Sequence, residues 1–161
     1  MRERASVSVS KALGLGAISG LRSLSGPAFV SRAASQGRLD LEGTPLAFLG
    51  SPRLAKLLAL MELGELVGDK LPATPSRTSP LPLLGRTASG ALVGAVVSVS
   101  EGRRATIGAA LGSTAAIVAA FAGERLRALA IEKSGLPDPV VALAEDATVL
   151  VVGLRSMKDI R

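Results

Sequence analysis

The stretch from Ala105 to Gly123, ATIGAALGSTAAIVAAFAG, contains no charged residue. A run of about 20 predominantly apolar residues is what an α-helix needs to cross the hydrocarbon core of a bilayer. The segment that follows, ERLRALAIEK, mixes charges with apolar residues, which predicts that the helix leaves the bilayer along its interface. This run predicts an α-helical membrane protein.

The composition of the chain agrees with helices packed in lipid. The mean hydropathy is +0.43, 18 residues are Gly, and aromatic residues make up only 2%. Small residues allow close helix contact in membranes, although the absent Trp and Tyr depart from the usual aromatic belts. The net charge of +6 is spread along the chain without interleaved aromatics, so we expect membrane lipids as partners and no nucleic acid.

Two residue types are missing, and their absence limits the chemistry. The chain has no Cys and no His, which excludes a Cys/His metal site, a thiol nucleophile and any scheme that needs imidazole. We therefore expect no catalytic residue, no metal and no cofactor. The N-terminus resembles a signal peptide but shows no clear cleavage site, so we interpret it as a retained first helix.

The predicted fold class is all-α, a small multispanning transmembrane bundle of four to five Gly-rich helices in a single membrane domain, 1–161. We expect the first segment to be interrupted by Arg22 and Pro27, and a Pro-rich, extended connector over 71–85. The helical segments are predicted over 8–35, 52–70, 86–100, 105–123 and 138–154.

Glycine spacing predicts where these helices touch. GxxxG marks close helix–helix contact in apolar helices. The predicted packing pairs are Gly16–Gly20, Gly64–Gly68, Gly90–Gly94 and Gly108–Gly112. So small a bundle with Gly-lined faces also predicts a homo-oligomer.

An internal inverted repeat is a further hypothesis. LALMELGELVG resembles VALAEDATVLVVG, which would place repeat halves at 8–71 and 102–154, linked by the connector 71–85 and the helix 86–100. If the N-terminus lies inside, Lys and Arg fall about equally on both sides. The positive-inside rule then gives no orientation.

Carboxylates within an apolar segment are the main candidate for a site. On a helix at about 100° per residue, Glu62, Glu65 and Asp69 share one stripe, and a carboxylate facing lipid is costly. We expect the stripe to face the protein interior, within salt-bridge reach of at least one cation. The candidate cations are Arg22, Lys70, Arg77 and Arg86.

Charges near the two ends of the chain complete this candidate site. Glu145 and Asp146 lie about two turns into the last helix, and Asp138 is a natural N-cap for it, with Pro139 in the first turn. Arg22 lies beside Gly26–Pro27, where an opened helix with free backbone groups would suit an anion such as phosphate. The alternative is that Arg22 simply pairs with the carboxylate stripe.

Four stretches resemble a family of small bacterial membrane proteins catalogued as domain of unknown function 4126. They are ELVGDKLPATPSRT, GRTASGALVGA, GLRSLSGP and GLPDPVVALAED, and the resemblance extends from about Ala12 to Leu154. It implies an integral membrane location and no known activity. The resemblance also favours a shared site that contains Glu65, Asp69, Lys70 and Pro72, together with Arg22, Arg77, Asp138 and Glu145.

Two classes of function fit these observations. One is a small transporter or channel with a polar intramembrane site, and the alternative is a non-catalytic membrane subunit or assembly scaffold whose buried charges are structural ion pairs. An enzyme is not expected, because no positioned nucleophile or metal set accompanies the carboxylates. Both classes predict a multi-pass protein of the bacterial cytoplasmic (inner) membrane.

Overall fold

The computed structural model describes residues 2–68 and 76–158, and helices are the only regular secondary structure in this part of the chain. The α-helices are α1 (Arg2–Leu21), α2 (Ser25–Ser35), α3 (Pro52–Gly68), α4 (Pro80–Ser100), α5 (Ala105–Ser134) and α6 (Asp138–Lys158). A short 3-10 turn, η1 (Ala47–Gly50), precedes α3. The all-α prediction is therefore confirmed for the described residues.

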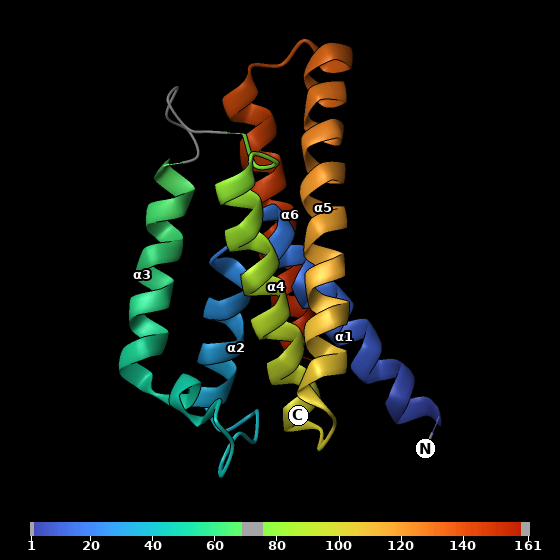
Figure 1. The fold of residues 1–161 in the computed structure, drawn as a ribbon. Helices are drawn as coiled ribbons and strands as arrows, with labels where there is room; N and C mark the ends of the chain where they lie inside the picture. Colours follow the sequence, from blue (N-terminus) through green and yellow to red (C-terminus); the bar gives the residue numbers. More distant parts are fainter. Residues whose placement is uncertain (1, 69–75, 159–161) are drawn as a thin grey trace.

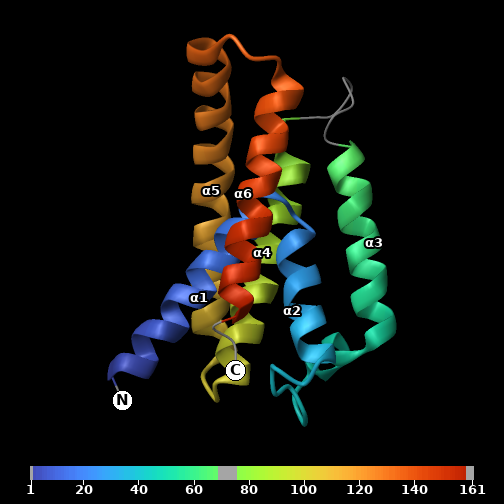
Figure 2. The same ribbon diagram turned by 180° about the vertical axis from the view of Figure 1, so that it is seen from behind.

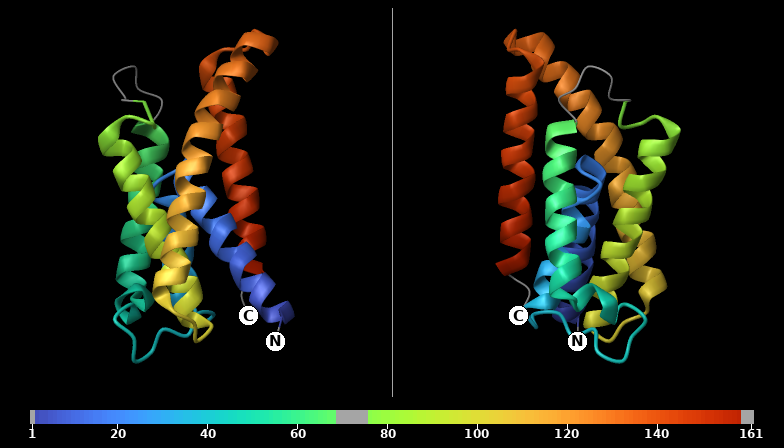
Figure 3. Two further views of the ribbon diagram at one scale, coloured as in Figure 1. Left: turned by 45° about the vertical axis from the view of Figure 1, so that its right-hand side comes forward. Right: turned by 90° about the vertical axis from the view of Figure 1, so that its left-hand side faces the viewer.

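The first two helices enter the bundle and return to the end from which they came. In Figures 1 and 2, α1 rises from the end that holds both chain termini, and α2 runs back to that same end, here named the terminal end. Helices α3, α4, α5 and α6 then alternate in direction between the terminal end and the opposite end, as the side views in Figure 3 also show. The chain therefore combines a helical hairpin with four helices that run between the two ends of the bundle.

This hairpin corrects the prediction of one interrupted first segment. The break falls at Arg22–Leu24, as the sequence indicated near Arg22, but the chain reverses there instead of continuing. Pro27 does not interrupt a helix, because it lies in the first turn of α2. Backbone N–H groups in a first helical turn have no intrahelical acceptor, so a proline there loses nothing.

The proline-rich connector is shorter than predicted. Helix α4 begins at Pro80, so the prediction that 71–85 is non-helical is wrong over its last residues. Ser79 is extended, and its carbonyl accepts the first helical hydrogen bond from Leu83 N at 3.0 Å. Pro80 and Pro82 thus both lie in the first turn, where proline is tolerated. The extra residues lengthen α4 to 21 residues.

Two of the described helices, α4 and α5, are long and apolar enough to cross a membrane. Helix α5 continues without a break through the charged segment after Gly123, for 30 residues in all. It ends at Gly135, whose positive φ of 66° closes the helix with a hydrogen bond from its N–H to Ile131 O. The apolar part of α1, Val9–Leu21, is shorter.

Glycines bring α1, α4 and α5 together. A Cβ on Gly94 would lie 2.0 Å from Gly108 O, and a Cβ on Gly90 would lie 2.5 Å from Gly112 O. Gly16 meets Gly112 in the same way, at 2.6 Å from its carbonyl oxygen. Only glycine permits such backbone contact, so these positions fix how closely the three helices approach.

The same contacts show how deep the hairpin reaches. Gly16 lies against Gly112, and Gly20 lies against Ala116, so α1 and α5 run in the same direction. Helix α5 continues to Ser134 beyond the level at which α1 ends. The turn between α1 and α2 therefore lies inside the bundle, well away from both ends of α5.

Helix α3 stands apart from this core. It packs chiefly against α2 and η1 and has no fully buried residue. A Cβ on Gly64 or Gly68 would meet no heavy atom within 4 Å, so the prediction that this pair packs against another helix of the chain is wrong for the described residues. Leu57, Leu60 and Val67 are each more than half exposed. This helix offers an apolar surface that the rest of the described chain does not cover.

We predict that alanine destabilises the protein at Gly94 and is tolerated at Gly64. Gly94→Ala should destabilise the protein by about 1–3 kcal/mol, because the new methyl group overlaps the Gly108 carbonyl. Gly64→Ala is the matched control, since it adds the same methyl group to a helix where there is space. Unfolding of both variants by denaturant titration in detergent measures the difference. Equal stabilities would show that the contact between Gly94 and Gly108 leaves room for a methyl group.

Candidate functional site

A buried arginine–aspartate pair joins the turn after α1 to α6. Arg22 Nε donates to Asp146 Oδ1 at 2.8 Å, and Arg22 Nη2 donates to the same oxygen. The Arg22 side chain is 4% exposed and that of Asp146 is 6% exposed. Asp146 reaches this position because it lies about two turns into α6, as the sequence indicated. A pair so far from water is stable only when both charges are present.

Glu65 satisfies the backbone at the start of α2. Its carboxylate accepts hydrogen bonds from Ser23 N at 2.8 Å and Leu24 N at 2.9 Å, and also from Ser23 Oγ at 2.7 Å. These N–H groups precede the first turn of α2 and have no intrahelical acceptor. A negative charge at a helix N-terminus is also favoured by the helix dipole. Glu65 therefore fastens α3 to the break in the hairpin.

Arg86 performs the complementary task at the end of α1. Its Nη1 donates to Gly20 O at 3.1 Å and to Leu21 O at 2.6 Å, and these carbonyls lie in the last turn of α1. A cation at a helix C-terminus is favoured by the dipole. Arg86 Nη2 also lies 3.8 Å from Glu65 Oε1. The two broken helix ends are thus closed by one anion from α3 and one cation from α4.

A second charged group lies nearer the opposite end. Arg77 Nη2 donates to Glu145 Oε2 at 2.8 Å, with a second contact between Arg77 Nη1 and Glu145 Oε1. Arg127 Nη1 lies 3.9 Å from Glu145 Oε2, and Arg127 also donates to Asp138 from Nε at 2.8 Å and from Nη2 at 2.7 Å. These contacts connect the segment before α4 with α5 and α6.

Asp138 differs from the deeper carboxylates because its side chain is 55% exposed. The hydrogen bonds from Arg127 lower the pKa of the Asp138 carboxyl below its usual value. Asp138 was predicted as an N-cap, and the structure instead uses its carboxylate to bind Arg127 across the loop between α5 and α6. At this exposed start of α6, solvent weakens the pair.

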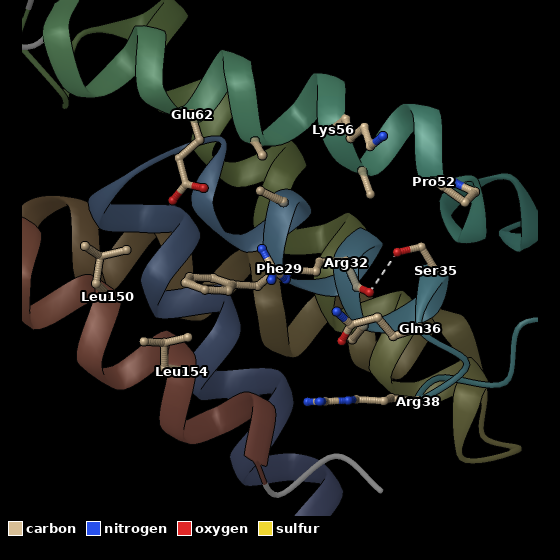
Figure 4. A pocket seen from close by; sticks show the side chains of 14 residues that line it. Phe29, Arg32, Ser35, Gln36, Arg38, Pro52, Lys56, Glu62, Leu150 and Leu154 are labelled. Atoms are coloured by element: carbon tan, nitrogen blue, oxygen red, sulfur yellow. Dashed lines mark hydrogen bonds between the residues drawn. The ribbon is translucent and has the colours of Figure 1, made fainter.

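The predicted carboxylate stripe divides between two places. Glu65 lies among the buried charges, whereas Glu62 is half-buried and lines an open cavity between α2, α3 and α6 (Figure 4). The cavity has a volume of about 650 Å³. Asp69, Lys70 and Pro72 lie outside the described residues. The structure thus brings Arg22, Glu65 and Arg86 together around the hairpin turn and leaves Glu62 elsewhere.

Sequence reasoning missed the roles of Ser23, Thr78 and Arg127. Ser76 Oγ donates to Glu124 Oε1 at 2.6 Å, and Thr78 Oγ1 donates to the other carboxylate oxygen. Serine and threonine near a charged residue are too common to single out in a sequence. The contact of Arg127 had one signal in the sequence, because the loop after α5 is short and brings the start of α6 beside Arg127.

The chemistry open to this arrangement is limited. No group of three or more potential metal ligands occurs within residues 2–68 and 76–158. Glu65, Glu145 and Asp146 each lie within salt-bridge reach of an arginine. The geometry describes ion pairs that hold helices together.

The fold and site define a small all-helical protein with two helices able to cross a membrane and a set of buried ion pairs around a broken helix. The family model described as "Domain of unknown function (DUF4126)" matches residues 9–158, and the chain belongs to this family. The resemblance found in the sequence is therefore confirmed. No curated protein and no solved structure matches the chain.

We predict that the buried pair is far more important for stability than the exposed one. Asp146→Asn should destabilise the protein by about 3–5 kcal/mol, because it leaves the buried Arg22 charge without its partner. Asp138→Asn is the matched control, with an expected loss of about 0–1 kcal/mol. Denaturant titration in detergent measures both. The double variant Arg22→Asp with Asp146→Arg should recover part of the larger loss, and equal effects of the two Asn variants would refute the assignment.

Proposed function

We propose that this chain is a multi-pass protein of the bacterial cytoplasmic membrane that acts as a non-catalytic membrane subunit or assembly scaffold. The observation that supports this function best is the pairing of the buried charges. Arg22 and Asp146 are almost fully buried and neutralise one another, and Arg86 is 4% exposed while it binds the end of α1. Groups committed in this way maintain the fold and are not held ready for a substrate.

Membrane insertion is supported by more than the two apolar helices. Leu60, Leu63 and Val67 of α3 are largely exposed, and a surface of this kind in water would favour aggregation. The backbone at the α1–α2 break is bonded by Glu65 and Arg86, as irregular backbone at membrane depth requires. We infer that α3, α4, α5 and α6 cross the bilayer and that the hairpin enters from one side.

The hairpin also changes the reading of orientation. Cations at the start of α1 and after α2 belong to the same end, so the terminal end carries most of the Lys and Arg residues. Those in the described segments at that end include Arg32, Arg38, Arg53, Lys56, Arg103, Arg104 and Arg155, and those of the opposite end are Arg77, Arg125, Arg127 and Lys133. By the positive-inside rule the terminal end is cytoplasmic.

A transporter or channel is the second candidate function. The observation that favours it is the open cavity at Glu62. Glu62 belongs to the carboxylate stripe, and it lies on α3 together with Glu65, which binds the α1–α2 break. Transporters commonly place a substrate beside a discontinuous helix. In this chain, however, Glu65 already occupies the free backbone groups at the break.

We predict the membrane topology as follows. The protein should stay in the membrane fraction after carbonate extraction. Because the chain has no cysteine, single-cysteine variants report on each end cleanly. In spheroplasts, an impermeant thiol reagent should label Ser134→Cys, in the last turn of α5, and should label Arg103→Cys, in the α4–α5 loop, only after permeabilisation. Release by carbonate, or labelling of both variants from outside, would overturn this arrangement.

Cysteine labelling also separates the scaffold from the transporter. Ser25 is fully buried at the start of α2, so Ser25→Cys should resist a water-soluble thiol reagent in the folded protein. Arg103→Cys, at an exposed position in the α4–α5 loop, should react and serves as the accessible control. Both reactions are followed by mass spectrometry on protein in nanodiscs. Rapid labelling of Ser25→Cys would indicate a water path to the break and would favour transport.

A further inference from the structure

The open cavity is formed where α3 stands away from α6. Helix α2 lies between these two helices in Figures 1 and 2, and all three contribute lining residues. Its volume of about 650 Å³ is within the range of about 300–1,000 Å³ typical of small-molecule sites. The cavity contains none of the paired residues Arg22, Glu65 and Asp146, so it is separate from the buried ion pairs.

Three cations lie on the side of the cavity nearest the terminal end. Arg32 is in the last turn of α2, Arg38 follows in the connector, and Lys56 is in the second turn of α3. All three side chains line the cavity (Figure 4) and belong to exposed residues. None of the three has a carboxylate within salt-bridge distance in the described part of the chain. Their positive charge is therefore available to an anion from outside the chain.

Apolar side chains line the rest of the cavity. Phe29 lies on α2, Ala55 and Ala59 lie on α3, and Leu150 and Leu154 lie on α6 (Figure 4). The cavity thus combines cationic and apolar lining residues. A soluble anion would use only the first part, whereas a molecule with an anionic head and a hydrocarbon chain would use both.

We infer that this cavity binds an anionic phospholipid. Its phosphate lies among Arg32, Arg38 and Lys56, and one acyl chain follows Phe29, Leu150 and Leu154. The inference rests on the proposed membrane placement, in which these cations lie at the cytoplasmic surface. Basic pockets between transmembrane helices on that side are suited to anionic headgroups, and each Lys or Arg near such lipids contributes about 1 kcal/mol.

Glu62 provides a way to distinguish an anionic headgroup from a zwitterionic one. It is the one carboxylate among the cavity-lining residues, and in Figure 4 it extends from α3 toward the cavity. A zwitterionic lipid could use Glu62 to bind its ammonium group, whereas an anionic headgroup is only repelled by it. For an anionic lipid, Glu62→Gln should leave binding unchanged or strengthen it.

The test measures lipid retention on the purified protein by native mass spectrometry in detergent. The probes are phosphatidylglycerol, phosphatidylcholine and inorganic phosphate. The wild type should retain phosphatidylglycerol in preference to phosphatidylcholine. The triple variant Arg32→Gln, Arg38→Gln and Lys56→Gln should weaken retention on the order of 100-fold, since each lost cation removes about a factor of five.

A matched variant removes the same charge without touching the cavity. This control is the triple variant Arg53→Gln, Arg103→Gln and Arg104→Gln. The three residues are exposed, belong to the same end and do not line the cavity, so the variant should retain phosphatidylglycerol normally. Equal losses in both triple variants would overturn the site in favour of a general surface charge. If the cavity triple variant does not fold, Arg38→Gln alone replaces it, with an expected loss of about fivefold.

Two further outcomes decide the identity of the ligand. Leu150→Gln combined with Leu154→Gln should weaken retention of the lipid, because these leucines face the proposed chain position. Inorganic phosphate that displaces the lipid at equal concentration, or a loss of binding in Glu62→Gln, would contradict the proposal. Lipid retention on purified protein is independent of the labelling experiments above, so the lipid site can fail while the scaffold function stands.

Discussion

The closure of the two helix ends at Arg22–Leu24 is the interaction on which the rest of the structure depends. A chain that reverses inside a bundle exposes carbonyls at the end of one helix and N–H groups at the start of the next. In a bilayer neither set can turn to water, so each needs a partner from the protein. Glu65 supplies the acceptor and Arg86 supplies the donor. This explains why α3 carries the carboxylate of Glu65 near its end.

The reversal also determines the topology. Because α1 and α2 return to the same end, four helices remain to run between the two ends of the bundle, so α1 begins and α6 ends at the terminal end. The cations flanking the hairpin then gather at one end, and the cavity between α2, α3 and α6 opens beside them. The proposed orientation and the proposed lipid site thus both follow from one local break in a helix.

Sequence patterns predicted those features that depend on local spacing. The apolar run gave α5, three of the four glycine pairs gave positions that lie at the α1–α4–α5 contacts, and helical periodicity placed Asp146 well inside α6. The reversal at Arg22 could not be predicted, since a kinked helix and a helical hairpin have the same local sequence signals. The stripe prediction treated Glu62 and Glu65 alike, yet one turn of α3 separates a hydrogen-bonded anion from a cavity wall. That difference depends on where α2 packs, which is tertiary information.

The distribution of the ion pairs explains how helices made of small residues keep one register. The backbone contacts at glycines lie between α1, α4 and α5, whereas the charged contacts also reach α3 and α6. Each pair in this chain joins different elements: Arg22 joins the hairpin to α6, Arg86 joins α4 to the hairpin, and Arg77 joins the start of α4 to α6. A slide of one residue would separate several of these charges at once, and an unpaired charge buried in the protein is costly. The glycines set the distance between helices, and the buried charges select the single register in which all of them are paired.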